Sequence, residues 1–222
     1  VRVDGQTART AEEKVDPEAA AITVDGQPVE TERFTYVMLH KPAGLLTAAR
    51  DSRAPTVMQL LPESCARRKV LPVGRLDKDT TGLLLFTNDG ELAHRLLSPK
   101  RHVWKTYEAT VTGRLTAADE ETFARGITLS DFTALPARME ILSAGEDESR
   151  ARVQVREGKF HQIKRMFGAL GHEVTALSRL TFGALRLPAE LPPGQYRELT
   201  EEELSALREE AGLTEPERNE DA

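Results

Sequence analysis

One apolar run constrains the fold of this chain more than any other feature. Residues 82–86 read GLLLF, and the Asn88-Asp89-Gly90 turn ends the run. A strand this apolar cannot leave one face in water, so it belongs in the centre of a sheet with both faces covered. We therefore expect a central strand here, held rigidly by its surroundings.

The remaining patterns predict both strands and helices, in irregular order. Residues 105–113, KTYEATVTG, alternate as a strand does. Thr116 with Asp119, and Thr200 with Glu203, have the spacing of capping boxes at helix starts. No glycine-rich loop joins a strand to a helix, which disfavours a doubly wound nucleotide-binding fold. The prediction is an α+β fold, with a central mixed, largely antiparallel sheet flanked by helices.

An amphipathic helix is predicted at residues 159–171, KFHQIKRMFGALG. Phe160, Ile163, Phe167 and Leu170 recur at spacings of three and four, so we expect them to form its buried face.

The opposite face of that helix carries His161, Lys164 and Arg165, at i, i+3 and i+4. Two cations and an imidazole could bind a phosphate or a carboxylate. A solvated basic face is an equally good reading, and the residues alone leave both open.

Net charge first argues against a nucleic-acid partner, because the chain carries −6. The charge is uneven, however. Residues 33–114 carry +7 and residues 151–197 carry +5, whereas residues 198–222 carry −8. The two basic blocks contain all the unusual motifs, so a local nucleic-acid surface remains consistent with the acidic total.

Two carboxylates, Asp77 and Asp79, lie two residues apart just before the apolar run. Three readings of this pair are open: a metal site, a pair for glycoside hydrolysis, or a turn stabilised by local hydrogen bonds. Tyr107 and Trp104 have two readings each, as core residues or as surfaces that stack on a base.

Three phrases taken together are far more specific than any one of them. GRLDKDTTGLLLFTNDGELAHRLLSP, KTYEATV and EGKFHQIKRMFGALGHEV occur in that order. They resemble the motifs of bacterial pseudouridine synthases that modify ribosomal RNA, in the small-subunit pseudouridine synthase A family. The resemblance covers residues 35–200 and implies an isomerase with the catalytic fold of that family, its active site in a cleft across the sheet.

The resemblance also implies roles for individual residues. Asp77 matches the catalytic aspartate, Tyr107 the tyrosine that stacks on the target base, and Lys164 the cation that pairs with the aspartate. The implied substrate pocket comprises Arg75, Leu76, Thr80, Gly82 and Ile163. The implied RNA-binding residues are Lys41, Lys78, Lys100, Arg101, Lys105, His161, Gln162 and Arg165.

Three regions are expected along the chain. By resemblance, residues 1–32 are the C-terminal remnant of a small RNA-binding domain with its linker, in which VRVDGQ and ITVDGQPV suggest two short strands. Residues 33–212 form the catalytic domain, and residues 213–222 form an acidic, disordered tail.

The expected partner is ribosomal RNA, within a partly assembled small subunit or as free RNA. The alternatives are a synthase for large-subunit ribosomal RNA and a non-catalytic RNA-binding factor for ribosome assembly. We expect a monomer without metal, cofactor or membrane association. A single cysteine, Cys65, excludes an internal disulfide, in agreement with a cytoplasmic location.

Overall fold

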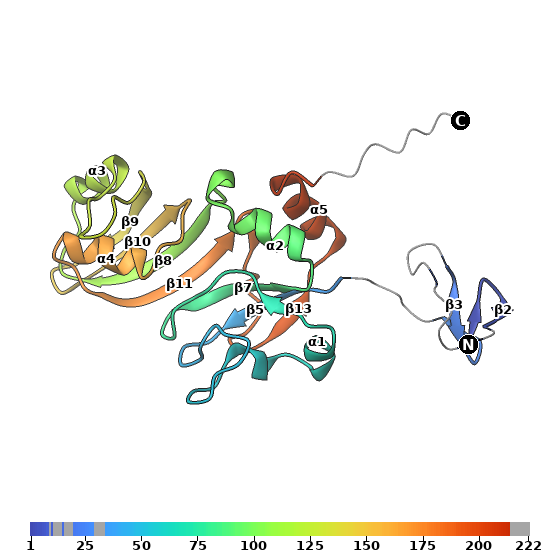
Figure 1. The fold of residues 1–222 in the computed structure, drawn as a ribbon. Helices are drawn as coiled ribbons and strands as arrows, with labels where there is room; N and C mark the ends of the chain where they lie inside the picture. Colours follow the sequence, from blue (N-terminus) through green and yellow to red (C-terminus); the bar gives the residue numbers. More distant parts are fainter. Residues whose placement is uncertain (9, 11–14, 16–19, 29–33, 214–222) are drawn as a thin grey trace. The chain divides into compact units, whose positions relative to one another are not determined.

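A computed structural model describes residues 1–8, 10, 15, 20–28 and 34–213 of the chain. It divides into two compact units, residues 1–35 and residues 36–222 (Figure 1). The predicted tail, apart from Leu213, lies outside the described residues. No helix in the described ranges is long and apolar enough to cross a membrane.

The small unit is a four-stranded sheet in the order β2-β1-β3-β4. Its strands are β1 (Arg2–Val3), β2 (Gln6–Thr7), β3 (Ile22–Val24) and β4 (Gln27–Pro28). Each of the two Asp-Gly pairs has positive φ at both residues, as a two-residue hairpin turn requires. Because each turn has a strand on both sides, the two similar phrases form two hairpins rather than the two single strands expected.

The large unit is built on a nine-stranded sheet, with a main path in the order β13-β5-β7-β11-β8-β10-β9. Neighbouring strands are antiparallel except β7 and β11, which are parallel. The strands are β5 (Tyr36–Lys41), β6 (Leu71–Pro72), β7 (Thr81–Thr87), β8 (Lys105–Thr112), β9 (Arg138–Ala144), β10 (Glu148–Val155), β11 (Val174–Phe182), β12 (Leu185–Arg186) and β13 (Tyr196–Glu198).

Helices cover the sheet in two groups (Figure 1). Buried residues of α1, α3 and α4 belong to one apolar core, and those of α2 and α5 to a second. The helices are α1 (Glu63–Arg67), α2 (Gly90–Leu97), α3 (Ala117–Arg125), α4 (Gln162–Ala169) and α5 (Glu201–Glu210), with 3-10 turns η1 (Val57–Leu60) and η2 (Pro99–Arg101).

The apolar run forms β7, as predicted. Its side chains point alternately to the two faces of the sheet and so enter both cores. Leu84 and Phe86 lie in the first core, while Leu83 and Leu85 lie in the second, and all four are fully buried. Two covered faces explain why no polar residue interrupts these positions. The predicted α+β fold with a mixed, largely antiparallel sheet and flanking helices is confirmed.

Both predicted capping boxes are present, at Thr116 with Asp119 and at Thr200 with Glu203. The expected burial of Phe160 is wrong, because its side chain is 71% exposed. The backbone at His161 is left-handed, with φ of 49°, and α4 begins only after it. Phe160 is thus outside the helix and off its apolar stripe, whereas Ile163 and Phe167 are buried as predicted.

Candidate active site

The loop between β6 and β7 is fixed by hydrogen bonds to its backbone. Thr47 Oγ1 donates to Leu76 O at 2.8 Å and accepts from Leu76 N at 3.2 Å. On the far side of Asp77, Lys41 Nζ donates to Lys78 O at 3.2 Å and to Thr80 O at 2.9 Å. Asp77 therefore occupies a loop that is held on both sides, as precise chemistry requires.

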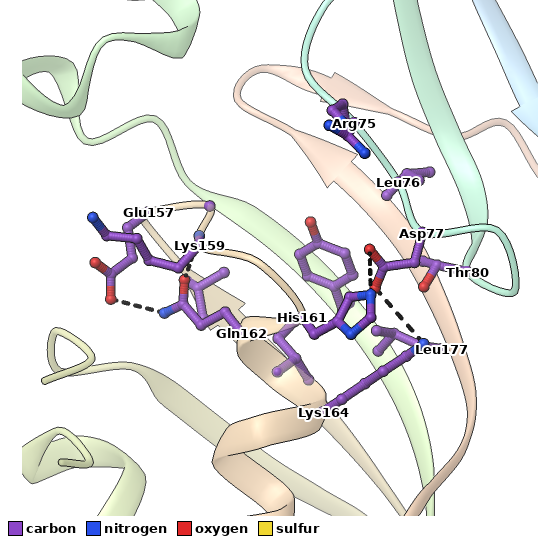
Figure 2. Close-up of a pocket in the computed structure, with 14 residues that line it drawn as sticks. Arg75, Leu76, Asp77, Thr80, Glu157, Lys159, His161, Gln162, Lys164 and Leu177 are labelled. Atoms are coloured by element: carbon purple, nitrogen blue, oxygen red, sulfur yellow. Dashed lines mark hydrogen bonds and ion pairs between the residues drawn. The ribbon is translucent and has the colours of Figure 1, made fainter. Parts of the chain in front are cut away.

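Asp77 faces the start of α4, where two potential cations approach its carboxylate (Figure 2). His161 Nε2 lies 3.4 Å from Oδ1, and Lys164 Nζ lies 3.7 Å from Oδ2. The Asp77 side chain is 28% exposed, so it is sheltered but open to a ligand. This arrangement fixes the direction of the Asp77 carboxylate.

Lys164 is shared between two carboxylates. Its Nζ lies 2.6 and 2.7 Å from the two oxygens of Asp79, closer than it lies to Asp77. The hydrogen bond from Lys164 lowers the pKa of Asp79. Lys164 thus contacts both carboxylates of the motif, and its nearer partner, Asp79, has a mostly exposed side chain.

A small pocket of about 80 Å³ opens beside Asp77. Tyr107 from β8 and Leu177 from β11 line it together with Ile163 from α4. Tyr107 is nearly buried within the sheet, between Val153 and Arg179 on the neighbouring strands. An aromatic ring among aliphatic side chains suits a flat, partly apolar ring such as a nucleobase.

A second cavity, of about 330 Å³, adjoins the first and shares Arg75, Asp77 and Tyr107 with it. Its other lining residues include Lys105, Arg179, Phe182 and the exposed Phe160. The Phe160 ring stacks on the ring of His161, with centroids 3.7 Å apart. Asp77 therefore lies where a small pocket meets a wider, cation-rich cavity.

Most of the residues that the sequence places in the site meet there. Those lining the small pocket are Arg75, Leu76, Asp77, Thr80, Tyr107, His161, Gln162, Ile163 and Lys164. They come from segments nearly a hundred residues apart in sequence, which β7, β8 and β11 bring side by side.

Gly82 lines neither cavity, which corrects its expected place in the substrate pocket. It pairs with Arg179 on the parallel strand β11, and a Cβ on Gly82 would lie 2.2 Å from Arg179 O. A glycine is needed because the two backbones approach closely at a positive φ of 104°.

Lys41 does not lie at the surface, where a phosphate-binding residue is expected. Its side chain is fully buried, and Nζ donates to the carbonyls of Pro42, Lys78 and Thr80. These three acceptors match the three donor hydrogens of an ammonium group. Lys41 therefore positions the loop that carries Asp77, and the expectation that it holds RNA phosphate is wrong.

Gln162 was expected to contact RNA, yet its amide is used inside the protein. Nε2 donates to Glu157 Oε1 at 2.8 Å, and Oε1 accepts from Lys159 N at 3.1 Å (Figure 2). Its side chain is nearly buried. Gln162 thus shapes the turn before α4. Because it also lines the small pocket, its expected contact with RNA stays a prediction.

The remaining expected RNA-binding residues lie around the site to different degrees. Lys105 lines the larger cavity, whereas Lys78, Lys100 and Arg101 are exposed and line neither cavity. Arg165 forms an ion pair with Asp131 and lines neither cavity. Whether these residues bind RNA stays a prediction.

Arg179, Lys159 and Phe160 line the larger cavity and were not among the expected site residues. Arg179 has a signal in the sequence, since it is a lone charge within the otherwise uncharged strand 174–182. Lys159 and Phe160 show none, because their place depends on the left-handed turn at His161. Among the described residues, no group of three His, Cys, Asp or Glu side chains could hold a metal ion.

Known proteins match most of the chain. Residues 35–169 match the family model described as RNA pseudouridylate synthase. An uncharacterized RNA pseudouridine synthase of Bacillus subtilis is 45% identical over 94% of this chain and 88% of its own length. Ribosomal small subunit pseudouridine synthase A of Escherichia coli is 40% identical over 93% of this chain and 88% of its own.

The fold agrees with the sequence matches. A crystal structure of a pseudouridylate synthase superimposes with a TM-score of 0.73 and 34% identity, covering 93% of this chain and 87% of that one. The sequence motifs that line the cavities around Asp77 thus belong to a fold that the matched enzyme shares. The chain belongs to the RNA pseudouridylate synthase family, as an isomerase of the group that includes ribosomal small subunit pseudouridine synthase A.

Proposed function

We propose that this chain converts a specific uridine of small-subunit ribosomal RNA into pseudouridine, with Asp77 as the catalytic nucleophile. The observation that supports this most is the position of the Asp77 carboxylate. It lies at the junction of a base-sized pocket and a wider cavity, facing Lys164 and His161. The 40% identity to a small-subunit rRNA synthase supports the choice of RNA.

The reaction breaks the bond from uracil N1 to ribose C1′ and forms a bond from C5 to C1′. The Asp77 carboxylate can attack C1′ directly, which gives an ester to the ribose, or it can assist formation of a glycal. In either route the uracil turns within the pocket while the ribose stays beside Asp77. The apolar walls around Tyr107 and Ile163 restrict water, which would otherwise capture the ribose.

To complete the reaction, C5 must lose a proton and N1 must gain one. Tyr107 presents a ring and a phenol in the same pocket, so it can stack on the uracil and accept the C5 proton. Lys164 lies beside the Asp77 carboxylate and helps to fix its direction by charge.

A paired or stacked uridine cannot reach Asp77, so the base has to flip out of the RNA. Arg75 and Lys159 line both cavities and can hold the displaced strand. In this proposal the chain acts as a cytoplasmic monomer without metal or cofactor. In this proposal the β1–β4 unit is a small RNA-binding unit.

The test is to incubate the purified chain with 16S RNA, with partly assembled small subunits and with 23S RNA, and to map pseudouridine by mass spectrometry. We expect one new pseudouridine, in 16S RNA or in the particle that contains it. A product in 23S RNA alone would assign the chain to the large subunit. Tight RNA binding with no product from any substrate would indicate an assembly factor and contradict the proposal.

A further inference from the structure

Two cations lie side by side within the sheet, next to the site but outside the chemistry assigned above. Lys105 begins β8, and Arg179 lies near the end of the adjacent strand β11. Both contact the ring of Phe182, with Lys105 Nζ 5.4 Å and Arg179 Cζ 5.1 Å from its centroid. Arg179 is only 2% exposed. The structure thus places two charged groups in a sheltered position.

These cations have few acceptors. Lys105 Nζ donates to Val103 O at 2.9 Å, and Arg179 Nε donates to Leu83 O at 2.8 Å. Arg179 Nη2 is buried and has no hydrogen-bond partner among the residues that the structure describes. Among the described residues, no carboxylate lies within 4.0 Å of either cation. A buried guanidinium with an unpartnered donor is costly unless a ligand supplies the acceptor.

The electrostatics agree with this geometry. Burial, and then the charge of Arg179, lower the pKa of Lys105 to about 8. Glu157 and Glu210 act in the opposite direction and offset only part of that effect. Lys105 therefore lacks enough nearby negative charge to offset its burial.

The 330 Å³ cavity gives an anion access to both groups. Lys105, Arg179 and Phe182 line it, and so do Asp77 and Tyr107. Within the described part of the chain, Asp77 is the one carboxylate of this lining, and His161 and Lys164 already face it. An anion in this cavity would thus lie close to any ribose held by Asp77.

We propose that Lys105 and Arg179 bind a phosphodiester of the RNA strand immediately next to the uridine that Asp77 attacks. This inference rests on the proposed function and adds to it the group that holds the strand in register. Phosphodiesters flank every ribose, so a strand that delivers its uracil to the small pocket must place a phosphate nearby. Arginine and lysine are the usual partners of such a group.

The test compares two lysines that differ in position but undergo the same change. Lys105→Gln removes the charge from the cavity, and Lys69→Gln removes one from an exposed residue that lines neither cavity. Both are made in Asp77→Asn protein so that binding is measured without turnover. The probe is an rRNA fragment that the wild-type chain modifies.

We expect Lys105→Gln to weaken binding about tenfold to a hundredfold, and Lys69→Gln to leave it unchanged. The slope of log Kd against log salt should fall by about 0.7 for Lys105→Gln, as loss of one phosphate contact requires. Equal affinities and slopes for the two variants would overturn the inference.

A second arm identifies the phosphate. Uncharged methylphosphonate linkages are placed on the 5′ side or the 3′ side of the target uridine. If the inference holds, one of the two RNAs binds the Lys105→Gln protein and its parent equally well. If Lys105→Gln still weakens binding to both RNAs, the phosphate is elsewhere and the inference fails.

The two proposals can fail separately. A chain that forms pseudouridine but passes neither binding criterion retains its proposed function and loses the phosphate site. A chain that modifies no RNA loses both.

Discussion

Two lysines of the catalytic unit, one fully buried and one half-buried, contrast in their surroundings. Lys41, at the end of β5, gives all three of its donor hydrogens to backbone carbonyls around the Asp77 loop. Lys105, at the start of β8, has one carbonyl acceptor and an arginine beside it. Burial is the main cause that lowers the pKa of each lysine to about 8.

The difference shows that burial alone does not assign a role to a cation. A buried ammonium whose acceptors are all present serves the structure, because it joins segments that would otherwise separate. A buried cation without its acceptors is stabilised only when a ligand arrives. On this interpretation Lys41 positions the loop, and Lys105 binds an RNA phosphate.

The largest expected effect is the loss of activity when a third lysine, Lys164, is replaced. Lys164 has carboxylate partners, and its side chain is 22% exposed. Lys164→Met should leave the fold intact and reduce pseudouridine formation by about a thousandfold, because Asp77 loses the charge that fixes it. Product formation and thermal unfolding measured together test this. A folded variant with near-normal activity contradicts the assignment of Lys164.

The next largest effect is a difference in the free energy of unfolding between variants of Lys41 and Lys105. Lys41→Met leaves three buried carbonyls without their donor, so the free energy of unfolding should fall by about 3 kcal/mol. Lys105→Met removes a poorly partnered charge, so the change should stay within about 1 kcal/mol. Urea unfolding of both variants measures the difference, and equal losses would remove the basis of the comparison.

The pH dependence of stability gives an effect of known sign. Lys105 has a pKa of about 8 in the folded chain against an ordinary value of 10.5. Between these values the unfolded chain binds more protons, so its contribution makes stability rise with pH from about 8 to 10.5. Below pH 8 both states are protonated and the contribution is constant.

Lys105→Met should therefore flatten that rise relative to the wild-type chain. Unfolding free energies at pH 7.5, 9 and 10.5 for both proteins measure this. A rise that is unchanged in the variant means that Lys105 does not titrate in this range.

Sequence reasoning predicts this fold well where the signal is local. The GLLLF run identifies the central strand because no other environment accepts it, and the capping boxes mark where α3 and α5 begin. The α+β class follows from such patterns. The gathering of Asp77, Tyr107 and Lys164 comes from the family resemblance, since nothing local connects residues so far apart.

The errors arise where backbone geometry or tertiary packing decides. Phe160 has helical spacing, but the left-handed turn at His161 removes it from the helix and exposes it. Lys41 was expected by resemblance to hold RNA phosphate, yet carbonyls from two loops converge on it. Arg179 matters only because β11 lies beside β8 and leaves its guanidinium at a cavity.

The most direct test of the central claim compares the two aspartates of the same loop. Asp77→Asn and Asp79→Asn make the same chemical change two residues apart, and Lys164 contacts both side chains. Pseudouridine formation on the modified rRNA is measured for each variant, with thermal unfolding as the control for folding. We expect no product from Asp77→Asn and most of the wild-type product from Asp79→Asn. Product from Asp77→Asn, or its loss in Asp79→Asn alone, would contradict the assignment of Asp77 as the nucleophile.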